Sequence, residues 1–354
     1  MTLPVTGSRF GGLSQVGVAL GLGILVLILG LEATGFNSME ALGAMWGGAF
    51  GSWYAFTSAT LVRAVPLILI GLGIAFAFQA GAFNIGAEGQ FYAGAIAATW
   101  IGLQAGSLPG PIAVTVTLSA AVMAGALWIG IPIWLRRRFG VIEVISTLLL
   151  NFVAEALVSL MVQGPLQESR GVYPQSDPVS LSARLSFLPT TRLHWGFPVT
   201  VLLAIILGVI RSRTLWGFRF RAVGANARAS AISGRIPVAR LFGYALAVSG
   251  MLAGLAGGME ITGVTYALFQ NLSPGFGFTG IAVALLARLN PYGIIGTGIL
   301  FAALETGASA MQREAGVPSV AVYVVEAVII IVVLVSDGLA RRSFEARTPA
   351  RDAA

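Results

Sequence analysis

Long apolar stretches alternate with short polar segments along most of the 354-residue chain. A stretch of about 20 apolar residues is long enough to cross the hydrocarbon core of a membrane as a helix. The pattern predicts about ten such helices, with eight or nine crossings plus re-entrant pieces as the alternative. We therefore expect an all-α, polytopic integral membrane protein. The expected helices lie near 15–32, 63–80, 90–105, 111–135, 141–163, 195–210, 239–258, 274–287, 292–309 and 317–336.

The composition supports a membrane protein that binds no nucleotide itself. Hydrophobic residues make up 56% of the chain and charged residues 10%, with a mean hydropathy of +0.87. Soluble domains carry about 25% charged residues, so an ordinary soluble enzyme is excluded. The chain has no cysteine, which excludes thiolate metal sites and cysteine nucleophiles. All 21 basic residues are arginine, so the lysine of a phosphate-binding P-loop is absent and another chain must bind any ATP.

The arginines predict the orientation of the chain in the membrane. With the N-terminus inside, 16 of the 21 arginines lie in cytoplasmic segments, seven of them between 211 and 240. Because cytoplasmic loops of membrane proteins are enriched in arginine, we expect both termini in the cytoplasm. The whole chain, 1–354, is then one transmembrane domain. Its expected cytoplasmic segments are 1–14, 211–238 and 338–354, and its main extracytoplasmic loop is 164–194.

Residues 83–90, Phe-Asn-Ile-Gly-Ala-Glu-Gly-Gln, interrupt the helical pattern. The glycines within 81–89 weaken a helix, whereas Asn84 can cap the start of a new one and place Glu88 in its first turn. An interrupted helix at membrane depth is tolerated where it lines a cavity or is buried in protein. The segment is therefore either a broken helix that presents Asn84, Glu88 and Gln90 to a solute path, or a capped helix end at the cytoplasmic surface.

Polar residues also occur inside the expected helix at 141–163. Glu143 follows three consecutive arginines, so pairing with them at the cytoplasmic edge explains it. Asn151 and Glu155 are four residues apart and share one helix face deep in an apolar stretch. Polar groups at that depth usually face the interior of a helix bundle. Asn151 and Glu155 therefore either contact a hydroxylated solute or hydrogen-bond to a neighbouring helix.

Glycines at 250, 254 and 258 recur every four residues and line one face of the expected helix at 239–258. Small residues at this spacing let two helix backbones approach closely. We expect tight packing of this helix against a neighbour.

The basic segment 219–240 predicts a short helix outside the membrane. Asn226 is a good N-cap, residues 227–233 give about two turns of helix, and Gly234 suits the position after its last residue. Small side chains flanked by arginines suit insertion into a groove on a partner protein. A solvated connector between two membrane helices is the alternative.

Four segments together resemble the permease subunits of bacterial ABC importers in the superfamily that serves branched-chain amino acids and simple sugars. They are 83–90, 143–151, 222–236, and 278–286 with Asn290-Pro291, and the resemblance extends from about 60 to 337. Sugar permeases of this group typically have Asp-Leu-Ser-Val-Gly where this chain has Asn-Ile-Gly-Ala-Glu-Gly. That difference is similar to the nucleoside (guanosine-type) branch.

The resemblance implies the rest of a transport machine. The short helix corresponds to a coupling helix that docks into an ATPase with two nucleotide-binding halves, which uses ATP and magnesium. A second permease, identical or different, completes the path, and an extracytoplasmic solute-binding lipoprotein delivers the solute. The chain is expected in the bacterial inner membrane, surrounded by lipid, with no catalytic residue, metal, cofactor or nucleic acid. The expected coupling residues are Ala222, Gly224, Asn226, Ala227, Arg228, Ala229, Ala231, Ile232 and Gly234.

The expected solute path includes residues that follow the helix at 239–258. Aromatic faces there suit stacking on a nucleobase, although aromatic residues also gather at membrane interfaces without a ligand. The loop at 164–194 either receives the binding protein or covers the outer mouth. The full set of expected path residues is Asn84, Glu88, Gln90, Asn151, Glu155, Tyr266, Phe269, Gln270 and Asn271.

The sequence thus predicts half of the translocation path of an ATP-driven importer, for nucleosides or, alternatively, a simple sugar or another small polar solute. An ion-coupled secondary transporter is the main rival, because it too uses broken helices, but it needs no docking helix. A membrane enzyme needs a nucleophile with its base or a carboxylate-rich metal site, and the sequence offers neither pattern.

Overall fold

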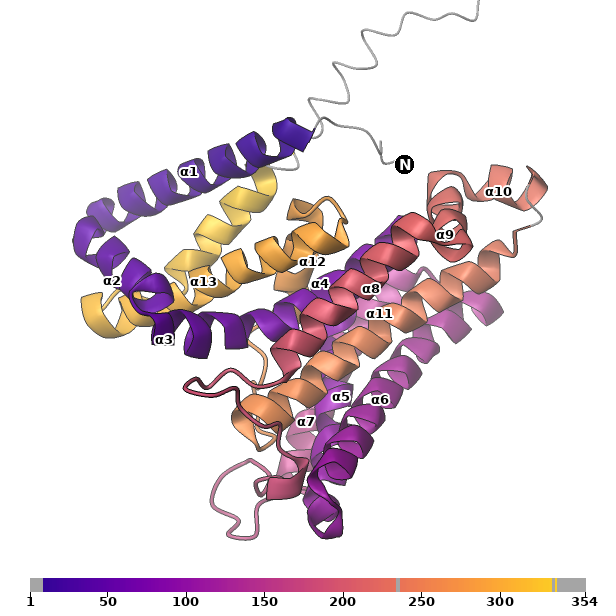
Figure 1. Ribbon diagram of the computed structural model, residues 1–354, viewed down its shortest axis with the longest axis horizontal. Helices are drawn as coiled ribbons and strands as arrows, with labels where there is room; N and C mark the ends of the chain where they lie inside the picture. Colours follow the sequence, from indigo (N-terminus) through magenta and orange to yellow (C-terminus); the bar gives the residue numbers. More distant parts are fainter. Residues whose placement is uncertain (1–8, 234–235, 333–334, 336–354) are drawn as a thin grey trace, which may run out of the picture. The chain divides into compact units, whose positions relative to one another are not determined.

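The computed structural model describes residues 9–233, 236–332 and 335, which group into two compact units. The first unit comprises Phe56–Ala302, and the second the described residues of Leu3–Ala55 and Ala303–Ala354. Within the described residues every regular element is a helix, which confirms the all-α prediction (Figure 1). The candidate membrane-crossing helices are Trp53–Gln79, Gly110–Phe139, Glu143–Gln163, Gly196–Arg213, Val238–Thr265 and Pro291–Ala315.

The first unit is a bundle of helices. All of them except the two helices within 215–233 lie close to an apolar stretch that was expected from the sequence. Shorter turns of helix also occur at Phe56–Thr60, Ala105–Ser107, Leu181–Ala183 and Ile261–Thr265. The helices are α4 (Leu61–Gln79), α5 (Ala87–Gln104), α6 (Gly110–Phe139), α7 (Glu143–Gln163), α8 (Gly196–Arg213), α9 (Leu215–Ala225), α10 (Ala227–Ser233), α11 (Val238–Glu260), α12 (Phe276–Leu286) and the start of α13 (Pro291–Ala315).

Helix α5 is almost entirely buried and packs against α6, α7, α11 and α12. Its small residues allow this position, because a Cβ added at Gly94 would lie 2.2 Å from the carbonyl oxygen of Gly254 on α11. On another face of α11, a Cβ at Gly254 would lie 2.4 Å from the carbonyl oxygen of Ala121 on α6, and Gly250 and Gly258 also face α6. The expected close packing along this glycine face is confirmed.

The second unit contains α1 (Arg9–Ala33), α2 (Ser38–Phe50), α3 (Trp53–Ala55), the remainder of α13 and an apolar helix at Ala321–Val332. Glycines again set the packing, since a Cβ at Gly48 would lie 2.2 Å from the Ala310 Cβ. Helix α2 was not expected from the sequence. Its start is fixed by Asn37, whose side-chain oxygen accepts hydrogen bonds from the backbone of Met39 and Glu40.

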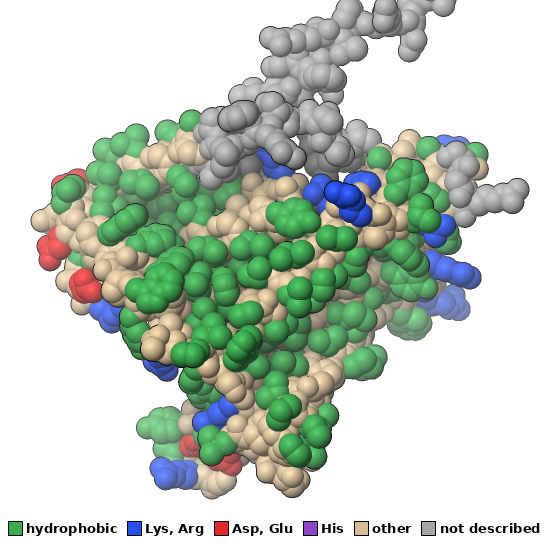
Figure 2. Space-filling view, in the orientation of Figure 1, with side chains coloured by type: hydrophobic (Ala, Val, Ile, Leu, Met, Phe, Trp, Pro, Cys, Tyr) green, Lys and Arg blue, Asp and Glu red, His purple; other side chains and the backbone are tan. Residues whose placement is uncertain are grey.

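Hydrophobic side chains cover much of the surface visible in Figure 2, and blue arginine side chains gather beside α9, α10 and the start of α11. This distribution suits a protein whose outer faces contact lipid, since soluble monomers rarely expose apolar patches of more than a few hundred Å².

Candidate functional site

The chain breaks between α4 and α5, at residues 80–86, and the break is held by buried side chains. The amides of Asn84 and Gln90 bond to each other in both directions, with N···O distances of 2.8 and 3.0 Å. The Asn84 amide also donates to the Ser249 hydroxyl on α11 at 2.8 Å. The N-cap residue of α5 is Gly86, so the prediction that Asn84 caps this helix is wrong. The side-chain oxygen of Asn84 instead accepts a hydrogen bond from the Gly86 N–H.

Helix α7 is hydrogen-bonded to the same break through Asn151. Its side-chain oxygen accepts a hydrogen bond from the Gly89 backbone at 2.8 Å, and its amide donates to the Ile85 carbonyl at 3.0 Å. An added Cβ at Gly89 would lie only 3.0 Å from the Leu150 carbonyl oxygen, so the two helices touch here. Of the two interpretations of Asn151, these contacts favour hydrogen bonding between helices.

Glu88 joins the first turns of two helices. Its side chain is only 6% exposed, and one carboxylate oxygen accepts a hydrogen bond at 2.6 Å from the backbone of Gly277, in the first turn of α12. The backbones are equally close, because a Cβ at Gly277 would lie 2.3 Å from the Glu88 nitrogen. The N-terminal ends of α5 and α12 both favour a negative charge, so a carboxylate stabilises their meeting.

A cavity of about 360 Å³ lies next to this junction and is called the Glu155 cavity here. It brings together three of the expected path residues, Glu155 on α7 and the pair Gln270 and Asn271 that precedes α12. The Gln270 amide donates to the Ser159 hydroxyl at 2.6 Å and so ties this segment to α7. The complete lining is Tyr92, Phe152, Glu155, Ala156, Val158, Ser159, Gln270 and Asn271.

Sequence reasoning missed the two aromatic residues of the Glu155 cavity. Tyr92 lies one helical turn after Glu88, and Phe152 follows Asn151 directly. Both stand in apolar stretches, where an aromatic residue is ordinarily a packing residue. The sequence signal that could have identified them is their position next to predicted path residues, since Tyr92 lies four residues after Glu88 and Phe152 lies next to Asn151.

Two other expected path residues, Tyr266 and Phe269, are not among the residues that line this cavity. The Tyr266 ring lies under the Arg184 guanidinium, 4.4 Å from the ring centroid, and its backbone has a φ of 60° at the end of the short helix after α11. Phe269 forms an isolated bridge with Gln175. Both residues therefore hold the loop at 164–194 against the chain that follows α11.

The loop at 164–194 is hydrogen-bonded at several points to the segment that follows α11. The backbone N–H groups of Ser176, Val179 and Leu185 donate to carbonyl oxygens of residues 268, 266 and 262, each at 2.8 Å. Within the loop, hydrogen bonds from Gln175 and Tyr173 hold the pKa of Glu168 below its usual value, and those from Ser169 do the same for Asp177. The loop is therefore folded and held by its own hydrogen bonds to Glu168 and Asp177.

His194 lies at the end of this loop, just before α8, and is 1% exposed. Its Nδ1 accepts the Gly196 N–H at 3.1 Å, and a Cβ at Gly263 would lie 2.7 Å from the imidazole ring. Burial lowers the pKa of His194 to about 4 from its ordinary 6.5. The folded protein therefore keeps this imidazole neutral at neutral and mildly acidic pH.

We expect the stability of the first unit to fall between about pH 6.5 and pH 4 because of His194. In that window the unfolded chain binds a proton at this residue that the folded chain does not, so acid favours unfolding, by up to about 3 kcal/mol. Thermal midpoints of the wild type and His194→Gln are measured at pH 7 and pH 4.5. The wild type should lose more stability than the variant, and equal losses would contradict the assignment.

Most of the expected coupling residues lie on or beside α10, whose bounds match the helix expected from the sequence. The Asn226 side chain accepts the Ala229 N–H at 2.9 Å and caps the helix. Ala227, Arg228, Ala229, Ala231 and Ile232 are exposed, and the Ile232 side chain is 77% exposed. Gly234 lies outside the described residues. The exposed surface of α10 thus consists mainly of small side chains, with Ile232 as its protruding apolar side chain.

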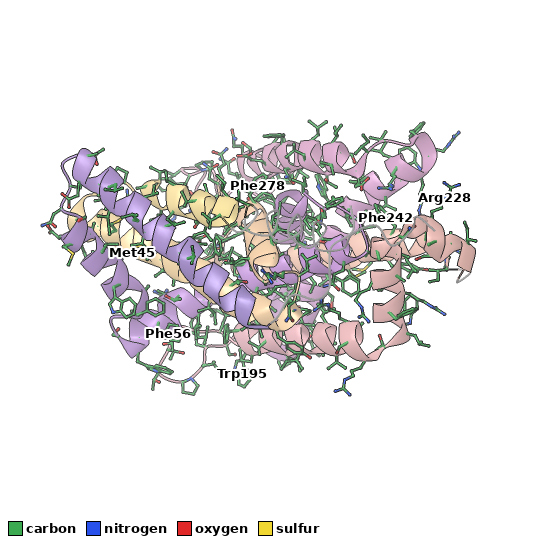
Figure 3. The ribbon with its side chains drawn as sticks, turned by 90° about the horizontal axis from the view of Figure 1, so that it is seen from above. Met45, Phe56, Trp195, Arg228, Phe242 and Phe278 are labelled. Atoms are coloured by element: carbon green, nitrogen blue, oxygen red, sulfur yellow. The ribbon has the colours of Figure 1, made fainter. Side chains whose placement is uncertain are left out.

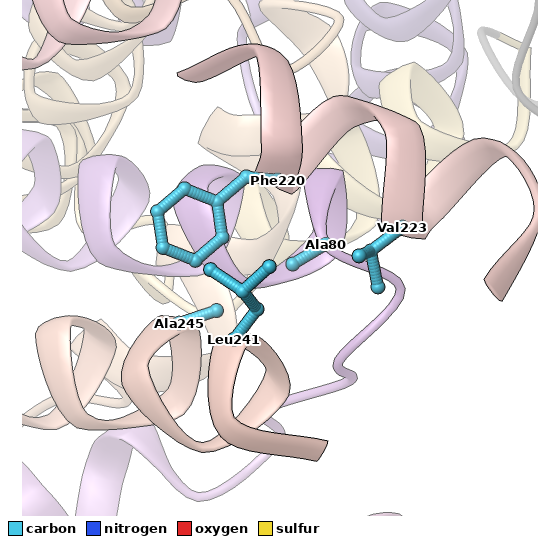
Figure 4. Packing of buried hydrophobic residues seen from close by; sticks show 5 residues of the cluster. All are labelled: Ala80, Phe220, Val223, Leu241 and Ala245. Carbon is cyan, nitrogen blue, oxygen red and sulfur yellow. The ribbon is translucent and has the colours of Figure 1, made fainter. Parts of the chain in front are cut away.

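Helix α9, which was not expected, carries the other coupling residues and connects α10 to the bundle. Phe220 and Val223 of α9 pack against Ala80 at the end of α4 and Leu241 and Ala245 of α11 (Figure 4). The Phe220 ring also meets the Phe76 ring at a centroid distance of 4.7 Å.

The contact of Gly224 is closer still, because a Cβ there would lie 2.0 Å from the Gln79 carbonyl oxygen. Gln79 in turn donates a hydrogen bond to the Leu289 carbonyl, between α12 and α13. The last turn of α9 therefore rests directly on the chain where α4 ends and the break begins. Ala222 and Gly224 are partly buried at this contact rather than exposed for a partner.

Residues 56–334 match the family described as branched-chain amino acid transport system / permease component. The chain is 37% identical over 321 residues to the guanosine ABC transporter permease protein of Bacillus subtilis, covering 88% of this chain and 91% of that protein. It is 35% identical over 318 residues to the glucose ABC transporter permease protein of Haloferax volcanii, with coverages of 87% and 83%. It is 32% identical over 330 residues to the nucleoside ABC transporter permease protein of Lactococcus lactis, with coverages of 90% and 89%.

Proposed function

The chain belongs to the branched-chain amino acid transport permease family of ABC importers, and we propose that it forms half of a path that carries nucleosides. Members of this family are membrane-embedded transport subunits rather than enzymes. They act with an ATPase subunit and a solute-binding protein.

The Glu155 cavity is the observation that carries the nucleoside proposal. Its volume of about 360 Å³ lies in the lower part of the range for small-molecule pockets, roughly 300–1,000 Å³. Tyr92 and Phe152 offer aromatic faces for a base, and Glu155, Gln270 and Asn271 offer acceptors and donors for base edges and ribose hydroxyls. Two of the similar permeases are named for guanosine and for nucleosides.

A simple sugar is the second candidate, because a similar permease is named for glucose. Carboxylate and amide groups bind sugar hydroxyls well, and the cavity would then use the same polar residues. The sequence of the break, with Asn84 and Glu88, remains the argument for the nucleoside branch.

Glu155 also indicates a second permease subunit. It is exposed on α7 among exposed Leu149, Phe152 and Val153, in a helix long and apolar enough to cross a membrane. A charged side chain in contact with lipid is costly, so such residues almost always face a bundle interior or a watery cavity. This face of α7 therefore lies on the path, closed by an identical or different partner permease.

The proposal includes the coupling role of α10 and the topology. The exposed alanines and Ile232 of α10 dock into the ATPase, and α9 carries the motion to the break. The proposed ten crossings count the six long helices, α5 and the three shorter apolar helices. The arginine distribution supports a cytoplasmic location for α10 and for both termini.

The test of the substrate is uptake by vesicles that contain the assembled importer. We expect ATP-dependent uptake of a labelled purine nucleoside, which an excess of unlabelled nucleoside suppresses and glucose does not. Glu155→Gln should reduce nucleoside uptake about tenfold, because a hydrogen bond to a charged group is worth about 1.5–3 kcal/mol. The control is Glu314→Gln, an exposed acidic residue near the end of α13, which should transport normally. If only glucose suppressed uptake, the nucleoside assignment would be wrong and a sugar would be the substrate.

A further inference from the structure

A second cavity of about 360 Å³ lies between the end of α6 and the start of α11, and it shares no lining residue with the Glu155 cavity. We call it the Arg137 pocket. Figure 3 places Phe242, one of its lining residues, at the end of this unit that also carries Arg228 on α10. The lining consists of Ile133, Arg136, Arg137, Val238, Ala239 and Phe242.

Two guanidinium groups form the polar wall of the Arg137 pocket. Arg136 pairs with the Glu143 carboxylate, and its guanidinium carbon lies 3.7 Å from the centroid of the Phe242 ring. Arg137 donates a hydrogen bond to the Ala239 carbonyl at 3.1 Å. A guanidinium carries five N–H groups, so these contacts fix both side chains and leave donors for an anion. One carboxylate faces two arginines, and the pocket keeps a positive charge.

Helix α6 also has an exposed apolar face, which is separate from the residues that line the pocket. Leu127, Ile131 and Trp134 are exposed along that face, and the Trp134 ring meets the exposed Phe139 ring with centroids 5.3 Å apart. Tryptophan and arginine at the end of a membrane-crossing helix mark the level of the lipid headgroups. The pocket therefore opens at the level of the headgroups, and its own apolar lining residues Ile133, Val238 and Phe242 can contact the first part of an acyl chain.

We propose that the Arg137 pocket binds the phosphate of an anionic phospholipid, in the leaflet that holds the end of α6. The charge of the pocket complements a phosphodiester, and basic pockets between membrane helices bind such headgroups. The apolar lining of the pocket favours a lipid over a soluble phosphate, because only a lipid carries apolar groups that can cover Ile133, Val238 and Phe242. The bound lipid would bridge α6 and α11, whose contact also supports the coupling end of the unit.

Native mass spectrometry of the full-length purified chain, supplied with phosphatidylglycerol or phosphatidylcholine, tests this proposal. We expect the wild type to retain phosphatidylglycerol preferentially. Arg137→Gln should weaken that retention about fivefold, since a basic residue near the surface contributes about 1 kcal/mol to anionic lipid binding. Arg138→Gln is the matched control, because Arg138 makes the same charge change one residue away but does not line the pocket.

A second variant removes space instead of charge. Ala239→Leu narrows the pocket while every arginine stays in place, and it should lose phosphatidylglycerol as Arg137→Gln does. Equal losses in Arg137→Gln and Arg138→Gln, or unchanged binding in Ala239→Leu, would show a general surface attraction and overturn the proposal. Displacement of the lipid by millimolar inorganic phosphate would also overturn it, in favour of a soluble phosphate. Circular dichroism confirms that each variant remains helical.

Discussion

Replacing Ile232 by aspartate is expected to abolish ATP-driven uptake while the membrane helices stay folded. The side chain of Ile232 is 77% exposed on α10, and it is the one large apolar side chain of that helix. Apolar anchors that insert into a partner's pocket often cost 2 kcal/mol or more when removed, about a 30-fold loss of affinity. An aspartate adds the cost of burying a charge. The ATPase subunit should no longer co-purify with the permease.

The matched control is Leu181→Asp, in the loop at 164–194. Leu181 is 79% exposed, so the two variants change equally exposed apolar residues to the same acid. We expect the Leu181 variant to retain the ATPase, because the loop is bonded to the opposite end of α11 from α10. If Ile232→Asp keeps both the ATPase and uptake, α10 is only a connector and the coupling role is wrong.

The contacts of α9 explain how a push on α10 would reach the solute path. Gly224 rests on the Gln79 carbonyl, and the break that follows is bonded through Asn84 to α11 and through Asn151 to α7. Beyond the break, Glu88 ties α5 to α12 beside the Glu155 cavity. A displacement of α9 would therefore act on a segment that hydrogen bonds tie to α7 and α11.

Hydropathy was sufficient to place most helices, because a membrane imposes one length and one composition on each crossing. Hydropathy did not predict α2 or α9. Helix α9 carries arginines that lower its hydropathy, and it is stabilised by Phe220 and Val223 packing on distant helices. The glycine face of α11 was predictable, because glycines that recur every four residues lie on one side of a helix and let that side approach a neighbour closely.

The site was predictable in its residue types but not in its pairings. The sequence predicts Asn84, Gln90 and Asn151 as path residues, with a capped helix end and hydrogen bonding between helices as the alternatives. In the structure they bond to each other and to the backbone of the break. Such pairings depend on side chains that are distant in the sequence, as Asn84 and Ser249 are. Their contact with a solute stays a prediction.

The strongest effect on folding is expected at Gly257 of α11. A Cβ there would lie 2.0 Å from the Phe91 carbonyl oxygen, in the interior of α5, where backbone rather than a flexible side chain is the obstacle. Gly257→Leu must push α5 away from α11 and open the packing that holds the break and the Glu88 junction. Overpacking of this kind costs about 3 kcal/mol or more. The variant should show a lower thermal midpoint in detergent and a low yield of folded protein.

Gly130→Leu provides the matched control, since Gly130 also lies in a long membrane-crossing helix but a Cβ there meets nothing within 4 Å. Leucine has the higher helix propensity, so this variant should be as stable as the wild type or slightly more stable. Because the two substitutions add the same side chain to apolar helices, any difference in thermal midpoint reports the contact between α5 and α11. Equal midpoints for the two variants would mean that α11 does not approach α5 at Gly257, and the central position of α5 would have to be abandoned.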